Sequence, residues 1–160
     1  MGFFTKDNVP AASEGLTPLS MDRIKAALDR AGWNYDIDDD GDLGGGWEYG
    51  IFYFFINGRS DEFLCVRGYW RGRLEESDYV KALEACNSWN TESIWPKTYV
   101  VRDDEGGIRL HVEHNVDYEH GLTDAQLDQH LLCAVNTGMA FFEKINEMFP
   151  EAWEKAKPEA

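Results

Sequence analysis

Residues 65–97 hold the stretch that decides the fold. It reads Cys65-Val66-Arg67-Gly68-Tyr69-Trp70, then Arg71-Gly72-Arg73, and after a helical pattern it continues with Asn87-Ser88-Trp89-Asn90 and Trp95-Pro96-Lys97. The first run is rich in β-branched and aromatic residues, which favour strands, whereas the middle has the period of a helix. The stretch therefore predicts a strand, a helix and the start of another strand. No set of nucleophile, base and orienting group accompanies it.

Working outward, periodicity predicts eight elements. Three helices are expected: one after the N-cap Ser20, one from about Ser77 to Asn90, and one from the capping box Thr123/Gln126 up to Pro150. Five strands are expected, at residues 33–38, 47–56, 63–70, 97–102 and from Ile108 through His114. The acidic, glycine-rich residues 39–46 are predicted as a turn, and residues 47–56, apolar on both faces, as a central strand. Short connections imply antiparallel pairing. The prediction is an α+β domain with a mainly antiparallel five-stranded sheet and packed helices, in the order α-βββ-α-ββ-α.

The domain organisation follows from composition. Residues 19–150 are predicted to form one domain, preceded by a flexible arm (1–18) and followed by a polar tail (151–160). The hydrophobic content of 43% supports a core.

Charge and cysteine usage limit the function classes. A net charge of −15 argues against nucleic acid and anionic membranes as partners, because both require Lys and Arg. Cys65, Cys86 and Cys133 are isolated thiols, which fit a reducing compartment. Residues 1–6 contain no long apolar run, so no signal peptide is expected, and no window is long enough to span a membrane. We expect a cytoplasmic protein.

The acidic loop from Asp36 to Asp42 resembles part of a calcium-binding loop. Carboxylates stand at its first, third and fifth positions and Gly41 at its sixth, as in an EF-hand. However, Trp47 stands where the bidentate Glu is needed, and strands flank the loop. The alternative is a hairpin turn with solvated carboxylates. No metal or cofactor site is predicted.

Enzyme chemistry finds little support in the remaining residues. His111 and His114 are three apart on a predicted strand and point to opposite faces, so they do not share a metal. No nucleophile elbow or phosphate loop is present, and Cys86 and Cys133 fit inert thiols. A metal enzyme or hydrolase would need His120, His130 or a cysteine gathered with carboxylates. We expect no catalytic residues.

Two sets of residues remain as candidates. Asn87 and Asn90 lie near the apolar stripe of their helix, and with Pro96 they are expected to lock helix, loop and following strand together through backbone hydrogen bonds. Aromatic residues beside arginine are typical of protein interfaces, although they are equally typical of a sheet packed on helices. The candidate protein-binding residues are Trp70, Arg71, Arg73, Trp89 and Trp95.

The chain resembles the YbjN family over about residues 17–148. The resemblance rests on residues 18–33, Gly41-Asp42, Trp47, Val66-Arg67-Gly68, Trp70, Asn87, Trp89-Asn90, Trp95-Pro96-Lys97 and the entry of the last helix from Glu119 to Leu127. These are bacterial proteins described as candidate regulators of sensory transduction, with a fold similar to type III secretion chaperones.

The resemblance implies a non-enzymatic domain that binds other proteins, chaperone-like or regulatory, with an unidentified client. Secretion chaperones are typically small, acidic and dimeric, so a homodimer is expected. The alternative function is a calcium-responsive module that uses the Asp36–Asp42 loop.

Overall fold

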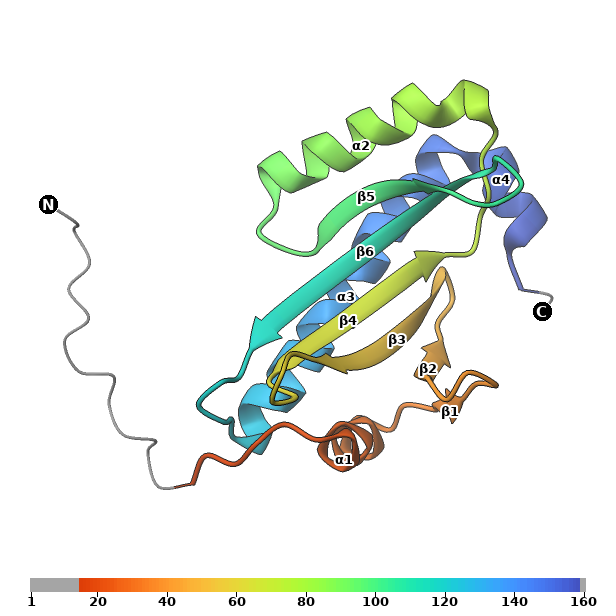
Figure 1. The fold of residues 1–160 in the computed structure, drawn as a ribbon. Coiled ribbons are helices and arrows are strands. Elements are labelled where there is room, and N and C mark those ends of the chain that lie inside the picture. The colour runs from red at the N-terminus through yellow and green to blue at the C-terminus, as the bar shows by residue number, and fades with distance from the viewer. Residues whose placement is uncertain (1–14, 159–160) are drawn as a thin grey trace, which may run out of the picture.

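The computed structural model describes residues 15–158. Its elements, in chain order, are α1 (Met21–Ala31), β1 (Asp36–Ile37), β2 (Leu43–Gly46), β3 (Gly50–Asn57), β4 (Phe63–Trp70), the short 3₁₀ helix η1 (Glu76–Asp78), α2 (Tyr79–Glu92), β5 (Lys97–Arg102), β6 (Ile108–Asp117), α3 (Asp124–Met148) and α4 (Pro150–Ala156). All strand pairs are antiparallel, in the sheet order β1-β2-β3-β4-β6-β5 (Figure 1). The α+β prediction is confirmed.

The sheet has six strands among the described residues, so the expected five-stranded sheet is wrong. The additional strand is β2, which lies in the stretch predicted as a turn. Glycines normally weaken strands, but a Cβ at Gly44 would stand 2.9 Å from the Tyr53 ring, and one at Gly45 would stand 2.8 Å from the Asn34 carbonyl oxygen. These glycines therefore permit close packing within the sheet.

The helix boundaries follow their caps. The Ser20 side chain accepts a hydrogen bond from Arg23 N, and Gly32 ends α1 in the left-handed conformation with φ 69°. At α3 the capping box of Thr123 and Gln126 is present, as predicted.

Described residues near both ends of the chain contact the rest of the domain. Residues 1–14 of the expected arm lie outside the described residues, and Thr17 pairs with Leu122 through two backbone hydrogen bonds of 3.2 and 2.9 Å. Residues 151–156, expected in a polar tail, belong to α4. Its Trp153 packs edge-on against Tyr49, with 5.5 Å between ring centroids.

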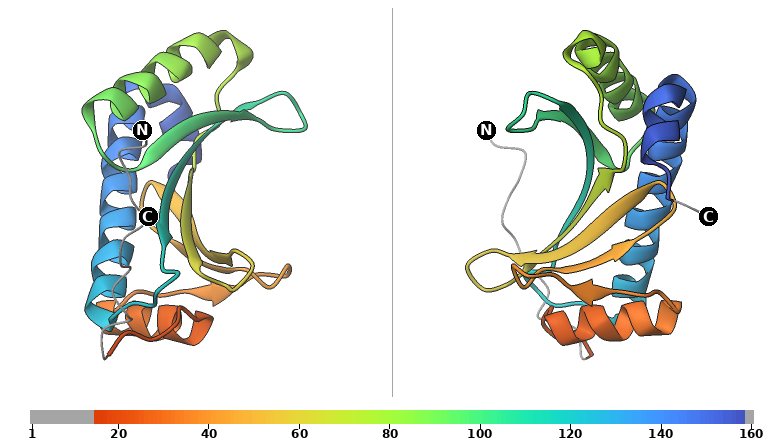
Figure 2. Two further views of the ribbon diagram at one scale, coloured as in Figure 1. Left: turned by 60° about the vertical axis from the view of Figure 1, so that its left-hand side comes forward. Right: turned by 90° about the vertical axis from the view of Figure 1, so that its right-hand side faces the viewer.

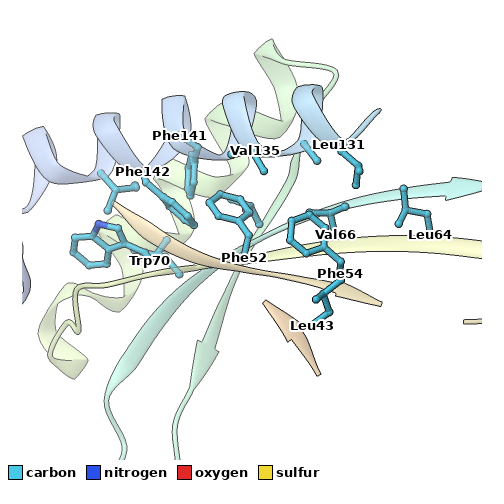
Figure 3. Packing of buried hydrophobic residues seen from close by; sticks show 14 of the residues in the cluster. Leu43, Phe52, Phe54, Leu64, Val66, Trp70, Leu131, Val135, Phe141 and Phe142 are labelled. Atoms are coloured by element: carbon cyan, nitrogen blue, oxygen red, sulfur yellow. The ribbon is translucent and has the colours of Figure 1, made fainter. Parts of the chain in front are cut away.

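The sheet is strongly curved, and α3 lies along its convex face (Figure 2). Side chains of α3 meet those of the sheet in one core, with Phe52 and Phe142 at its centre (Figure 3). Two glycines bring helix and sheet together there. A Cβ on Gly68 of β4 or on Gly138 of α3 would stand 2.6 or 2.7 Å from the Phe52 ring. No helix within residues 15–158 covers the concave face, so among the described residues that side of the sheet is open (Figure 2).

Candidate functional site: the open face of the sheet

The open face is built by alternate residues of β3, β4, β6 and β5. On β3, Phe52 and Phe54 are fully buried under α3, whereas Ile51, Tyr53 and Phe55 point the other way and remain partly exposed. The antiparallel register extends this pattern to the neighbouring strands. The open-face residues next to Ile51, Tyr53 and Phe55 are Tyr69, Arg67 and Cys65 on β4, then His111, Glu113 and Asn115 on β6, and Tyr99 and Lys97 on β5.

Aromatic rings form a row that crosses the sheet. Tyr53 meets Tyr69 edge-on at 5.6 Å between ring centroids, Tyr69 meets His111 at 4.6 Å, and His111 meets Tyr99 at 5.4 Å. Phe55 is stacked on Tyr53 at 6.0 Å. These separations are those of favourable aromatic pairs. The row therefore presents a preorganised aromatic surface across four strands.

A buried carboxylate lies in the middle of this face. Glu113 is 7% exposed; its Oε1 accepts hydrogen bonds from Arg67 at 2.7 and 3.0 Å, and its Oε2 pairs with Lys97. Burial raises the pKa of Glu113, but the hydrogen bonds from Lys97 and Arg67 outweigh burial and lower it to about 2. The carboxylate is thus held ionised and neutralised by its partners.

The cysteine beside this cluster is not an activated nucleophile. Cys65 Sγ lies 3.8 Å from Glu113 Oε1, and burial, followed by the charge of Glu113, raises the pKa of the thiol to about 11. Burial also raises the pKa of Cys86 to about 11.

The open face contains a depression formed by residues of β3, β4 and β6. This depression of about 590 Å³ has Ile51, Tyr53, Tyr69, Arg71, Arg109 and His111 among its lining residues. A neighbouring depression of about 430 Å³ shares Ile51, Tyr53 and Arg71 with it and reaches the β1–β2 turn. Through these shared residues the two depressions adjoin each other on the open face.

His111 is one of the polar residues that line this depression. Burial lowers its pKa to about 4, and the charges of Arg67 and Arg109 act in the same direction. The ring is therefore neutral at pH 7. None of the hydrogen bonds formed by the described residues uses a ring nitrogen of His111, which leaves the imidazole available to a ligand.

The predicted protein-binding residues do not form one surface. Trp70 is 2% exposed, and its indole Nε1 donates to Asn146 Oδ1 at 2.7 Å, so it is a core residue and not a surface anchor. Arg71 lies at the rim of the open face and donates to the carbonyl oxygens of Trp47 and Glu48. Arg73 forms a two-point ion pair with Asp103, at 2.8 and 3.0 Å.

The other two tryptophans lie on the opposite side of the sheet. Trp89 packs against Phe141 with 5.3 Å between centroids, and its Nε1 donates to the Trp95 carbonyl oxygen at 3.2 Å. Trp95 is 44% exposed and lies beside His114, and the peptide bond from Trp95 to the buried Pro96 is cis. These tryptophans therefore belong to the α2–β5 connection and not to the open face.

Of the two asparagines, Asn90 joins α2 to β5. Its Nδ2 donates to Thr98 O at 3.0 Å, and its Oδ1 accepts from Thr98 N at 2.9 Å. The amide thus occupies the outer edge of β5 as another strand would. Asn87 is exposed, and its side chain takes part in no hydrogen bond among residues 15–158.

The acidic loop is the turn of the β1–β2 hairpin. The carboxylate Oδ1 of Asp38 accepts hydrogen bonds from the backbone N–H groups of Asp40 and Asp42, and Gly41 adopts φ 88°. Short strands flank it, where an EF-hand has helices. Within residues 15–158, no group of three or more His, Cys, Asp or Glu side chains is placed to hold a metal ion.

The histidines expected in an enzyme do not converge with a cysteine. His120 is exposed and 4.0 Å from Glu119, whereas His130 Nδ1 lies 3.1 Å from Nε2 of His114 on the core side of β6. His111 and His114 lie on opposite faces, as predicted from the strand geometry.

The open face was missed by sequence reasoning, although a signal for it exists. The β3 run Ile51-Phe52-Tyr53-Phe54-Phe55 is apolar on both faces, which indicates that both are covered. Tyr69, Tyr99 and His111 alternate with core residues in the same way. This pattern could have identified a second aromatic face, but not that it is left uncovered.

The arrangement of the sheet and α3 defines the class of protein. It is an α+β domain whose curved antiparallel sheet buries one face under a long helix and exposes the other. A model of the YbjN family, described as "Putative bacterial sensory transduction regulator", matches residues 20–147. The chain belongs to the YbjN family.

A solved structure has the same fold. The crystal structure of YbjN from E. coli, described as "a putative transcription regulator", is similar with a TM-score of 0.72 and 14% sequence identity, covering 84% of this chain and 96% of that chain. No curated protein matches the chain. The family is described as regulatory and not as enzymatic. No helix of the described residues is both long and apolar enough to cross a membrane.

Proposed function

We propose that this chain is a non-enzymatic, cytoplasmic binding domain, chaperone-like or regulatory, which takes a segment of another protein on the open face of its sheet. The observation that carries the proposal is the aromatic row on this face, from Tyr53 through Tyr69 and His111 to Tyr99. Tyrosine and arginine are the residue types enriched at protein interfaces, because they combine large contact area with hydrogen-bonding groups.

The shape of the face supports a protein segment as the occupant. Exposed apolar and aromatic side chains that are rimmed by charged residues are typical of an interaction site. Here they lie on a concave face and include Ile51, 37% exposed, beside the aromatic row. The regulatory description of the family and the expected likeness to secretion chaperones agree with a binding role.

The calcium-responsive alternative has no specific observation in its favour. The Asp38 carboxylate is engaged by two backbone N–H groups of its own hairpin turn. A calcium module would melt at a higher temperature with millimolar calcium, because a ligand that binds only the folded state stabilises it. We expect no such increase.

A pull-down from lysate of the native host tests the proposal with two matched variants. Ile51→Glu places a charge on the open face, and Ile94→Glu places the same charge on the α2–β5 connection, where Ile94 is 86% exposed. Both variants should fold, because both side chains are exposed. A protein retained by wild type and Ile94→Glu but lost with Ile51→Glu is the expected result.

The opposite pattern, loss only with Ile94→Glu, would place binding on another surface and overturn the proposal. The expected homodimer stays a prediction, which light scattering on the purified chain tests.

A further inference from the structure

The open face differs in charge from the molecule that carries it. The chain has 30 acidic and 15 basic residues, yet on the open face both Arg67 and Lys97 pair with one carboxylate, that of Glu113, and Arg109 lies farther along β6 beside His111. Asp103, from the β5–β6 turn, compensates part of this charge through Arg109 at 3.2 Å. The cluster of Arg67, Lys97 and Glu113 therefore carries a net positive charge, whereas the larger depression beside it is lined by two arginines and two aspartates.

Two guanidinium groups reach the larger depression with donors to spare. Arg71 donates through Nε and Nη2 to neutral carbonyl oxygens, and no ion pair of the described residues includes it. Arg109 donates through Nε to Asp103 and through Nη1 to Gly72 O. The Nη1 group of Arg71 and the Nη2 group of Arg109 take part in no hydrogen bond among residues 15–158. A carboxylate is the partner that a planar guanidinium recognises best.

The walls beside these donors are apolar and aromatic. Ile51, Tyr53 and Tyr69 line the same depression as both arginines. An acidic side chain that reached the guanidinium groups would therefore place its neighbours along the segment against aromatic rings.

The far rim sets a limit on the charge of the partner. Asp38 and Asp42 of the β1–β2 turn line both depressions. They repel further carboxylates, as does the net charge of −15 at longer range. This arrangement favours one acidic residue in an apolar segment over a run of acidic residues.

We infer that the open face recognises a protein segment in which one Asp or Glu is flanked by aromatic or aliphatic residues, the carboxylate binding to Arg71 and Arg109. This inference rests on the proposed function and names the chemistry of the partner. A basic segment, a strongly acidic segment and a second copy of this chain are the competing occupants.

Selection from a phage-displayed library of random peptides tests the inference. The probe is the library itself, depleted on the Ile51→Glu variant so that only peptides bound through the open face are kept. We expect the selected peptides to carry a single Asp or Glu next to aromatic residues. Replacing this residue by its amide in a synthetic peptide should weaken binding by about tenfold or more, the usual contribution of a charged hydrogen bond.

A double-mutant cycle assigns the carboxylate to its arginine. Arg71→Met should weaken binding of the acidic peptide by about tenfold. It should leave binding of the amide peptide nearly unchanged, because the Arg71→Met substitution and the change of carboxylate to amide remove the same interaction. The matched control is Arg59→Met, which removes the same charge from an exposed position in the β3–β4 turn. It should leave both affinities unchanged.

The outcomes separate the two proposals. Selected peptides that are neutral, basic or strongly acidic, but still require Ile51, would overturn the inference and leave the binding function in place. Equal losses for the acidic and amide peptides in Arg71→Met would overturn the assignment to Arg71. A library that yields no peptide dependent on Ile51 would overturn both proposals.

Discussion

Replacing Asn90 by alanine should destabilise the fold, whereas the same change at Asn87 should not. Both residues lie on α2, three positions apart, so the two substitutions change helix propensity equally. Only Asn90 makes hydrogen bonds through its side chain, to the N–H and carbonyl groups of Thr98 on β5.

The magnitude follows from what the deletion exposes. Thr98 is 3% exposed, so Asn90→Ala leaves two buried backbone groups without a partner, at a cost of about 1–3 kcal/mol each. Asn90 lies at the sheet edge, where water can replace part of its amide, and this places the total near the lower end, at about 2 kcal/mol. For Asn87→Ala the expected change stays within about 0.5 kcal/mol, as for exposed positions elsewhere. Asn90→Asp should cost at least as much as Asn90→Ala, because a carboxylate oxygen would then face the Thr98 carbonyl oxygen.

Urea unfolding followed by circular dichroism measures these changes. The three variants and the wild type are compared by their midpoints at a common slope, which requires two-state behaviour. Equal midpoints for Asn90→Ala and Asn87→Ala would refute the reasoning. So would a midpoint for Asn90→Ala that matches that of the wild type.

Three further predictions concern the core and the histidines. The pKa values of His111 and His114 are both lowered to about 4, mainly by burial, so the unfolded chain binds more protons than the folded one between about pH 6.5 and 4. Urea midpoints should therefore fall as the pH decreases through this range, and less steeply in His114→Asn; a midpoint independent of pH would contradict the burial of both rings. Gly138→Ala should lower the free energy of unfolding by about 1–3 kcal/mol, because the new Cβ would stand 2.7 Å from the Phe52 ring. Thermal or urea unfolding measures this change, and an unchanged stability would show that α3 can shift away from the sheet without cost. Trp70→Phe should cost about 2 kcal/mol, since it leaves a buried amide oxygen of α3 without its donor, and a neutral result would argue against the buried position of the indole.

The order of the elements could largely be predicted, because periodicity and caps are local signals. The capping box at Thr123 and Gln126 and the glycine after α1 mark two helix ends through residues that are close together in the chain. β2 could not be predicted in this way. Its glycines at 44–46 have low strand propensity. Gly44 and Gly45 are needed because the Tyr53 ring and the Asn34 carbonyl oxygen lie close to them in the fold, and no local sequence pattern reveals these contacts.

The candidate site was harder to predict for a similar reason. Trp70 and Arg71 are adjacent in sequence and looked like an interface pair, but successive strand residues point to opposite faces. Trp70 therefore entered the core, whereas Arg71 stayed at the rim of the open face. Alternation shows which residues share a face. It does not show which face receives the helix, because that depends on where α3 packs.

The two edges of the sheet are less accessible than its open face, and this difference indicates how a partner would bind. Exposed sheet edges invite pairing with another strand, and this sheet limits both of its edges among the described residues. On one side β1 has only two residues, and on the other Asn90 occupies the N–H and carbonyl groups of Thr98 in β5. Within residues 15–158 no element covers the open face, and the ion cluster around Glu113 interrupts its aromatic surface. Addition of a strand at an edge is therefore disfavoured, and we expect a partner to lie across the strands, held by side chains of the open face.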